Sequence, residues 1–201
     1  MSLMNSSWAA ASAVGVDFTP YYSNGRWSLT DYGWTWASDY DWGWAPFHYG
    51  RWLTLPGRGW CWVPGRIWGP AWVHWRHGGG YVGWTALPPR GIRIAPPLGA
   101  RAAHWNFVPA PQLGAGRLAR LAPNMVPSYY HRTVPGNVLR AVGNTRVNIG
   151  PPPGILSLGE VRPFPLRSLP GALPRSQVTV GVGVPLASRP YVTTARPGWG
   201  R

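Results

Sequence analysis

The sequence predicts an all-β fold built from antiparallel hairpins, and three observations lead to that prediction. Glycine and proline make up about a quarter of the 201 residues (27 Gly and 24 Pro), and so many turn-forming residues exclude long helices. Fifteen tryptophans supply large apolar side chains. An internal repeat of 25–26 residues runs through the first half. We therefore expect hairpin repeats that form a curved sheet or partial barrel, followed by a Pro/Arg-rich, largely extended region.

Three matches define the repeat. They are Gly25-Arg26-Trp27 with Gly50-Arg51-Trp52, Tyr32-Gly33-Trp34-Thr35-Trp36 with Arg58-Gly59-Trp60-Cys61-Trp62, and Trp42-Gly43-Trp44-Ala45 with Trp68-Gly69-Pro70-Ala71. Glycine-rich turns then predict hairpins that pair 26–30 with 34–38, 51–55 with 60–63, and 71–76 with 81–86. Alternation along a strand puts Trp34 and Trp36 on one face, and likewise Trp60 and Trp62. Cross-strand aromatic pairs contribute roughly 0.2–1 kcal/mol each, so a ladder of them can stabilise a small sheet.

The charge of the chain changes at Pro89. Residues 1–89 contain five arginines and four aspartates, whereas residues 90–201 contain fourteen arginines, one glutamate and 17 of the 24 prolines. We expect short β-like stretches at 92–94, 106–108, 146–149 and 177–184, and at most two helical turns within 114–122. Runs such as 151–153 and 163–165 predict polyproline II or extended chain.

These patterns divide the chain into three parts. Residues 1–16 form an N-terminal segment that is disordered or a signal remnant, and residues 17–110 form the Trp-rich hairpin domain. Residues 111–201 form a basic Pro/Gly-rich region with short strands that is partly disordered. No apolar run is long enough for a transmembrane helix.

The run from Gly25 to Pro89 is dense in Gly-Trp-x-Trp and Trp-Gly-x-Ala pairs. It resembles a family of bacterial Trp-rich proteins of unknown function, the YXWGXW-type or proline-rich exported proteins, over about residues 17–110. The resemblance implies export and a periplasmic, cell-envelope or extracellular location. This chain departs from the family because a signal peptide is not evident at its start, which lacks a cationic segment. The family has no established catalytic residues, so the resemblance implies none here.

Metal binding and hydrolysis have weak support in the sequence. Cys61, His74 and His77, with His48 as a fourth, form the best metal-ligand set, yet His74 and His77 would point to opposite faces of a strand. The carboxylates that could flank a glycosidic bond each have an ordinary role in a turn or loop; they are Asp31, Asp39 and Asp41. We expect no catalytic residue, no metal and no cofactor.

Binding is the stronger interpretation. Aromatic side chains between hairpins can stack on sugar rings, quaternary amines or bases, and the candidates are Trp42, Trp44, Tyr49 and Trp68. Their alternative role is in the core. The basic region can attach to anionic envelope polymer, peptidoglycan or lipopolysaccharide, through Arg90, Arg93, Arg101, Arg117 and Arg120. It can also bind nucleic acid or act as a charged linker.

The sequence thus favours a non-enzymatic, cell-envelope-associated structural or binding protein, with an aromatic hairpin platform and a polycationic attachment region. A single-stranded nucleic-acid-binding protein is the first alternative. A glycan-binding or glycan-processing module is the second. Exposed strand edges make self-association a further expectation.

Overall fold

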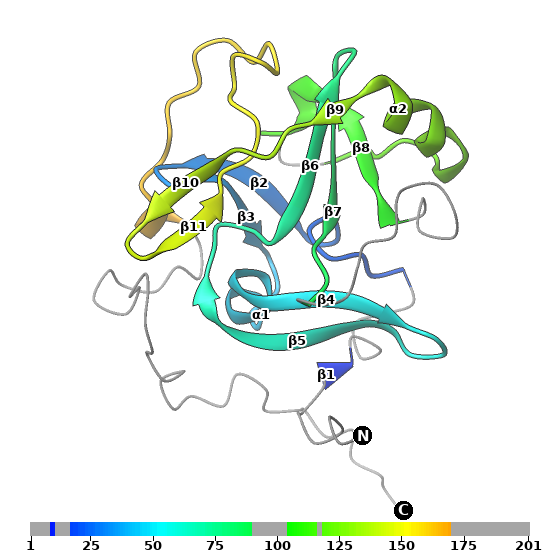
Figure 1. Ribbon diagram of the computed structural model, residues 1–201, viewed down its shortest axis with the longest axis vertical. Coiled ribbons are helices and arrows are strands. Elements are labelled where there is room, and N and C mark those ends of the chain that lie inside the picture. The colour runs from blue at the N-terminus through cyan, green and yellow to red at the C-terminus, as the bar shows by residue number, and fades with distance from the viewer. Residues whose placement is uncertain (1–8, 11–16, 90–103, 116–117, 170–201) are drawn as a thin grey trace, which may run out of the picture.

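The structure is a computed structural model, and it describes residues 9–10, 17–89, 104–115 and 118–169. Short antiparallel sheets dominate the described residues, helices are few and brief, and the strands form no closed barrel (Figure 1). This arrangement confirms the predicted all-β class.

All three predicted hairpins are present. They are formed by β2 (Gly25–Thr30) with β3 (Gly33–Ser38), β4 (Tyr49–Leu55) with β5 (Gly59–Trp68), and β6 (Val73–Gly78) with β7 (Tyr81–Ala86). Glycines with positive φ close the turns, among them Gly33 at +94° and Gly79 at +58°, as this region of backbone space requires. Strand β5 is the main departure from expectation, because it runs on to Trp68 instead of ending near residue 63.

Each hairpin carries one cross-strand pair of tryptophans. The pairs are Trp27 with Trp36, Trp52 with Trp62, and Trp75 with Trp84. All six side chains belong to one buried cluster. Within it the ring centroid of Trp27 lies 4.5 Å from that of Trp75 and 5.5 Å from that of Trp84. The third hairpin, whose sequence had diverged from the repeat, therefore repeats the same structural unit.

The hairpins do not join into one curved sheet. They belong to three separate sheets, ordered β2–β3, β1 (Ala9–Ala10)–β5–β4, and β8 (Asn106–Pro109)–β7–β6–β9 (Val134–Pro135). Because every hairpin buries its tryptophan pair toward the same centre, the sheets pack around that centre instead of extending edge to edge. Strand β3 is buried on both faces, since Thr35 and Ala37 are buried opposite Trp34 and Trp36.

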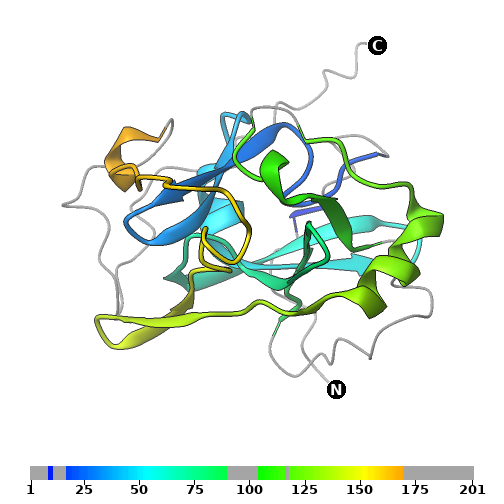
Figure 2. The same cartoon turned by 90° about the horizontal axis from the view of Figure 1, so that it is seen from above.

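Residues 104–169 pack against these hairpins. They contribute β8, the hairpin of β10 (Leu139–Val142) and β11 (Thr145–Asn148), and short helices. The helices named among the described residues are α1 (Trp44–His48) in the first half of the chain, and η3 (Ala110–Gln112), η4 (Pro123–Met125), α2 (Val126–Arg132) and η5 (Leu166–Ser168) in the second. Figure 2 shows α2 and the β10–β11 hairpin along one side of the molecule. The buried side chains from this part include Val108, Leu113, Val147, Leu156 and Leu166.

The expected stretches of the second half have mixed outcomes. Strands β8 and β11 confirm the predictions at 106–108 and 146–149. The predicted stretches at 92–94 and 177–184 lie outside the described residues. Where 114–122 is described it contains no helix, whereas α2 forms twelve residues beyond Gly114 at Val126. Phe164, in a segment predicted as extended, bridges to Thr30 in parallel.

Asn148 fixes the β10–β11 hairpin to the tryptophan core. Its amide nitrogen donates to Val73 O at 3.1 Å and to Asn137 Oδ1 at 2.8 Å. Its amide oxygen accepts from the backbone N–H groups of Val138 and Gly150. These bonds hold β10–β11 beside β6, on the side of the molecule where β5 ends (Figure 1).

Candidate functional site

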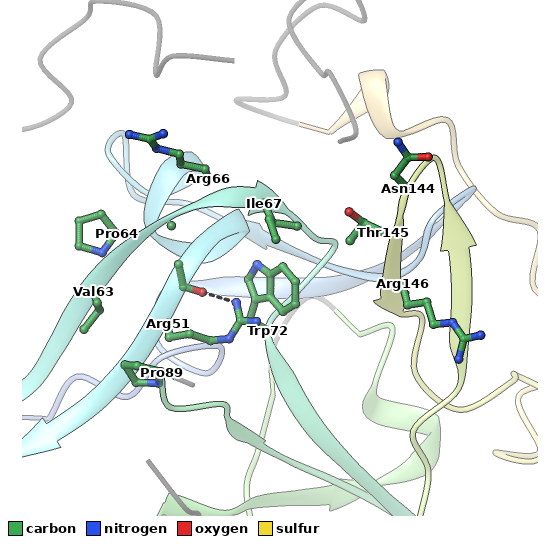
Figure 3. A pocket seen from close by; sticks show the side chains of 12 residues that line it. Arg51, Val63, Pro64, Arg66, Ile67, Trp72, Pro89, Asn144, Thr145 and Arg146 are labelled. Carbon is green, nitrogen blue, oxygen red and sulfur yellow. Dashed lines mark hydrogen bonds between the residues drawn. The ribbon is translucent and has the colours of Figure 1, made fainter. Parts of the chain in front are cut away.

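A pocket of about 500 Å³ lies between the β4–β5 hairpin and the β10–β11 hairpin (Figure 3). One wall comes from the bulged part of β4–β5, the floor from Trp72, and the other wall from the β10–β11 turn. Three arginines line it and none of the five acidic residues does. The lining residues are Gly50, Arg51, Val63, Pro64, Gly65, Arg66, Ile67, Trp72, Pro89, Asn144, Thr145 and Arg146.

Two hydrogen bonds hold Trp72 in place. Its backbone N–H donates to Tyr21 Oη at 3.2 Å, and its indole N–H donates to His48 O at 2.9 Å. Tyr21 is fully buried and donates to Phe47 O at 3.0 Å. Burial raises the pKa of the Tyr21 hydroxyl, so the group stays neutral. The floor of the pocket is therefore a fixed aromatic surface.

His48 supports the floor from inside the core. Its Nδ1 lies 2.9 Å from Gly69 O, a carbonyl that can only accept, so Nδ1 carries the proton. Burial lowers the pKa of the imidazole from 6.5 to about 4, against smaller opposing contributions from its backbone hydrogen bonds. His48 is thus a neutral hydrogen-bond donor at pH 7.

Arg51 packs over this floor. Its guanidinium carbon is 3.5 Å from the centroid of the Trp72 ring, and Nη1 donates to Gly50 O at 2.8 Å. The strand register shifts between Tyr49 and Arg51, and such bulges redirect a side chain. Gly50 makes the bulge possible, because its φ is +95° and a Cβ there would lie 2.1 Å from Val63 O.

The repeat shows how this arginine differs from its counterpart. Arg26 occupies the same place in the first hairpin, where Nη1 pairs with Asp39 Oδ1 at 2.9 Å. Twenty-six residues beyond Asp39, the second unit has Gly65. A Cβ on Gly65 would lie 2.7 Å from Gly50 Cα, so the bulge excludes an aspartate at that position. The second unit therefore has an arginine on an indole where the first has an arginine–aspartate pair.

The other polar groups lie around the rim. The guanidinium groups of Arg66 and Arg146 stand on opposite sides and point away from the centre, whereas Thr145 faces Ile67 (Figure 3). No carboxylate, histidine or thiol is among the described lining residues. The described lining is cationic and partly apolar, with three arginines beside Val63, Ile67 and Trp72.

Three of the four predicted contact aromatics come together elsewhere. Trp44, Tyr49 and Trp68 pack in a second cluster with Ala37, Leu166 and Leu169. Trp68 is buried, with its ring centroid 5.8 Å from that of His48.

Trp42 lies apart from that cluster, against the first core. Its ring stacks on Tyr40 at 4.6 Å and on Phe47 at 6.0 Å. Trp42, Trp44 and Tyr49 keep part of their surface exposed. A ligand-binding role for this set stays a prediction.

Of the predicted attachment arginines, Arg120 is described. It is exposed, its guanidinium lies 4.7 Å from the centroid of the Tyr22 ring, and Nη1 donates to Asn106 Oδ1 at 3.4 Å. Arg90, Arg93, Arg101 and Arg117 lie outside the described residues.

The candidate metal and acid residues do not assemble in the described part of the chain. No group of three or more His, Cys, Asp or Glu side chains there is placed to hold a metal ion. Cys61 is buried, and His74 contacts the amide of Asn137. Asp31 and Asp39 lie at opposite ends of the β2–β3 hairpin, where Asp31 Oδ1 accepts from Leu166 N and Asp39 binds Arg26.

Sequence reasoning missed the pocket residues Arg51, Trp72, Asn144, Thr145 and Arg146. The repeat held a signal for Arg51, because the position that corresponds to Asp39 in the first unit is Gly65 in the second. Nothing local in the sequence indicates that the turn at Asn144 lies opposite Arg51.

Comparison with known proteins relates the first half of the chain to one family model. Residues 3–91 match the model of a family of unknown function (DUF6600). No curated protein and no solved structure matches the chain. The match covers the Trp-rich half and does not specify the YXWGXW type. Among the described residues, no helix has the length and apolar character needed to cross a membrane.

Proposed function

We propose that this protein is a non-enzymatic binding protein of the cell envelope that attaches to an anionic polymer, peptidoglycan or lipopolysaccharide. The observation that carries the proposal is that most of the described arginines are exposed and that few acidic side chains are available to pair with them. Within the described ranges one ion pair joins a basic to an acidic side chain, Arg26 with Asp39. Eight described arginines are exposed: Arg58, Arg66, Arg120, Arg132, Arg140, Arg146, Arg162 and Arg167.

Arginine chemistry suits such a surface. The planar guanidinium donates two parallel hydrogen bonds to a carboxylate or a phosphate. Lipopolysaccharide carries phosphates and peptidoglycan carries carboxylates, and the chain has a net charge of +14 with no lysine. The tryptophan core supports the proposal by giving these arginines a rigid base. The envelope location rests on the resemblance to exported Trp-rich proteins.

Co-sedimentation of the full chain tests the proposal. Purified peptidoglycan and lipopolysaccharide vesicles serve as targets, and insoluble dextran serves as an uncharged control, each across a sodium chloride series. We expect retention on at least one anionic target that falls as salt rises, because exposed charge pairs are screened. Absence of retention on both targets, or equal retention on dextran at every salt concentration, would overturn the proposal.

Nucleic acid is the second candidate ligand. Arginines that lie on aromatic rings favour it, since Arg76 is 3.9 Å from the centroid of the Tyr130 ring and Arg120 is 4.7 Å from that of Tyr22. Single-strand binders combine arginine with aromatic stacking. In competition, single-stranded DNA that displaces the protein from lipopolysaccharide at equal or lower phosphate concentration would favour this candidate over the envelope polymer.

A further inference from the structure

We propose that the pocket between the β4–β5 and β10–β11 hairpins binds one anionic sugar residue, a sugar that carries a carboxylate or a phosphate. This inference rests on the proposed function, because such a residue is a unit of the anionic polymer. The proposed function requires only general electrostatic attraction between the exposed arginines and the polymer. The present inference adds one defined binding site.

The orientation of Arg51 is the first argument. Its guanidinium carbon lies over the Trp72 ring at 3.5 Å from the ring centroid, and Nη1 donates to Gly50 O. Trp72 is itself held by Tyr21 and by the backbone of His48. A guanidinium held in this way loses little conformational entropy when it binds, and its planar edge matches the two oxygens of a carboxylate or phosphate.

The charge of the lining is the second argument. Arg66 and Arg146 stand on opposite sides of the pocket with their guanidinium groups turned outward (Figure 3), and none of the five acidic residues of the chain lines the pocket. Positive groups around a hollow with apolar walls concentrate the electrostatic potential inside it. The pocket therefore selects anions over neutral molecules of the same size.

The size and the remaining lining residues point to a sugar. A volume of about 500 Å³ falls within the range typical of small-molecule sites. The Asn144 amide and the Thr145 hydroxyl offer hydrogen bonds to sugar hydroxyls. Ile67, an apolar side chain that is 43% exposed, and Val63 offer a surface for the C–H face of a ring. A bare inorganic anion would use neither of these features.

Isothermal titration calorimetry on the full chain tests the site. Glucuronic acid probes a carboxylate, glucose 6-phosphate probes a phosphate, and glucose is the neutral control. We expect at least one charged sugar to bind with a stoichiometry of one and glucose to bind at least about tenfold more weakly. The two charged probes distinguish the two sources of the anion. Absence of binding by both would overturn the inference.

Substitutions locate the binding. Arg51→Gln should weaken the charged sugar at least about tenfold. Arg51→Lys should give a smaller loss, because it keeps the charge without the planar fork. Arg58→Gln removes the same charge at the exposed turn of the same hairpin, outside the pocket lining. Although Arg58 belongs to the surface proposed to bind the polymer, the affinity of the pocket for a single sugar should not change. If Arg51→Gln fails to keep the native near-ultraviolet circular dichroism, Arg146→Gln, on the opposite wall, replaces it with an expected loss of severalfold.

The outcomes separate this inference from the proposed function. Equal weakening by Arg51→Gln and Arg58→Gln would show general charge attraction and overturn the pocket, while salt-sensitive retention on lipopolysaccharide would leave the proposed function standing. Binding of a charged sugar that depends on Arg51, without retention on either polymer, would support the pocket and overturn the proposed function.

Discussion

Trp72 is the residue at which the core and the candidate site meet. Its indole belongs to the main buried cluster and is 8% exposed, and Arg51 lies on its outer face. The same side chain thus stabilises the fold by burial and orients a charged group. A tryptophan can do both because its large ring has two faces and one hydrogen-bond donor.

His48 makes the stability of the protein sensitive to acid. Its pKa in the fold is about 4, below its value of 6.5 in the unfolded chain, so the unfolded chain binds more protons between these limits. The contribution of neutral His48 to the free energy of unfolding is therefore complete above pH 6.5 and is lost as the pH falls toward 4. This pKa difference between the folded and unfolded states corresponds to about 3 kcal/mol in the free energy of unfolding. Chemical denaturation at pH 7 and at pH 4 measures the change.

A variant isolates the contribution of His48. His48→Asn keeps an N–H donor for Gly69 O and does not titrate in this range. The free energy of unfolding of the variant should therefore fall by about 3 kcal/mol less than that of the wild type between pH 7 and pH 4. Burial also lowers the pKa of His74 and of His77. Both residues are present in the wild type and in the variant, so their effects cancel in the comparison. If the free energy of unfolding of the two proteins changed with pH in parallel, this role of His48 would be contradicted.

At the scale of elements, the sequence predicted the hairpins well because their signals are local. Alternating tryptophans and glycine turns fix the pairing of β2 with β3 without help from distant residues. These local signals could not predict how many separate sheets the hairpins form. It depends on how three tryptophan pairs share one centre, which is a property of side-chain packing. Helix α2, seven residues that begin near prolines, has no periodic pattern long enough to detect.

The attachment of β10–β11 to β6 depends on one side chain. Asn148→Ala removes two donated and two accepted hydrogen bonds. We expect it to lower the free energy of unfolding by about 2–3 kcal/mol and to speed amide hydrogen exchange across 139–148. Asn144→Ala, at the exposed turn of the same hairpin, should leave both unchanged. Wild-type exchange rates in Asn148→Ala would contradict this account of the attachment.

At the scale of the whole molecule, residues beyond 110 complete the core. The sequence did not reveal this, because the apolar residues involved are single positions in a segment dominated by proline and arginine. Composition predicts extended chain there. Tertiary packing decides otherwise for Leu113, Val147, Leu156, Leu166 and Leu169, which are all buried. The pocket escaped prediction for the same reason, since its two walls come from segments about 80 residues apart in the sequence.

Truncation measures how much the hairpins depend on this region. Five buried apolar side chains contribute roughly 8–15 kcal/mol, which is as large as the net stability of a typical domain. A chain of residues 1–110 should therefore lose cooperative thermal unfolding and native near-ultraviolet circular dichroism, whereas the full chain should show both. Cooperative unfolding of the shorter chain would show instead that the hairpin domain is stable alone.

We infer that the molecule binds anions at an arranged site and not merely through its net charge. The most direct test follows the arginine Nε–Hε signals by NMR during titration with glucuronic acid or glucose 6-phosphate, with the Arg51 signal assigned by its loss in Arg51→Gln. We expect a saturable shift of the Arg51 signal and none of the Arg58 signal. Small, unsaturable shifts of all arginine signals alike, or an unchanged Arg51 signal, would contradict it.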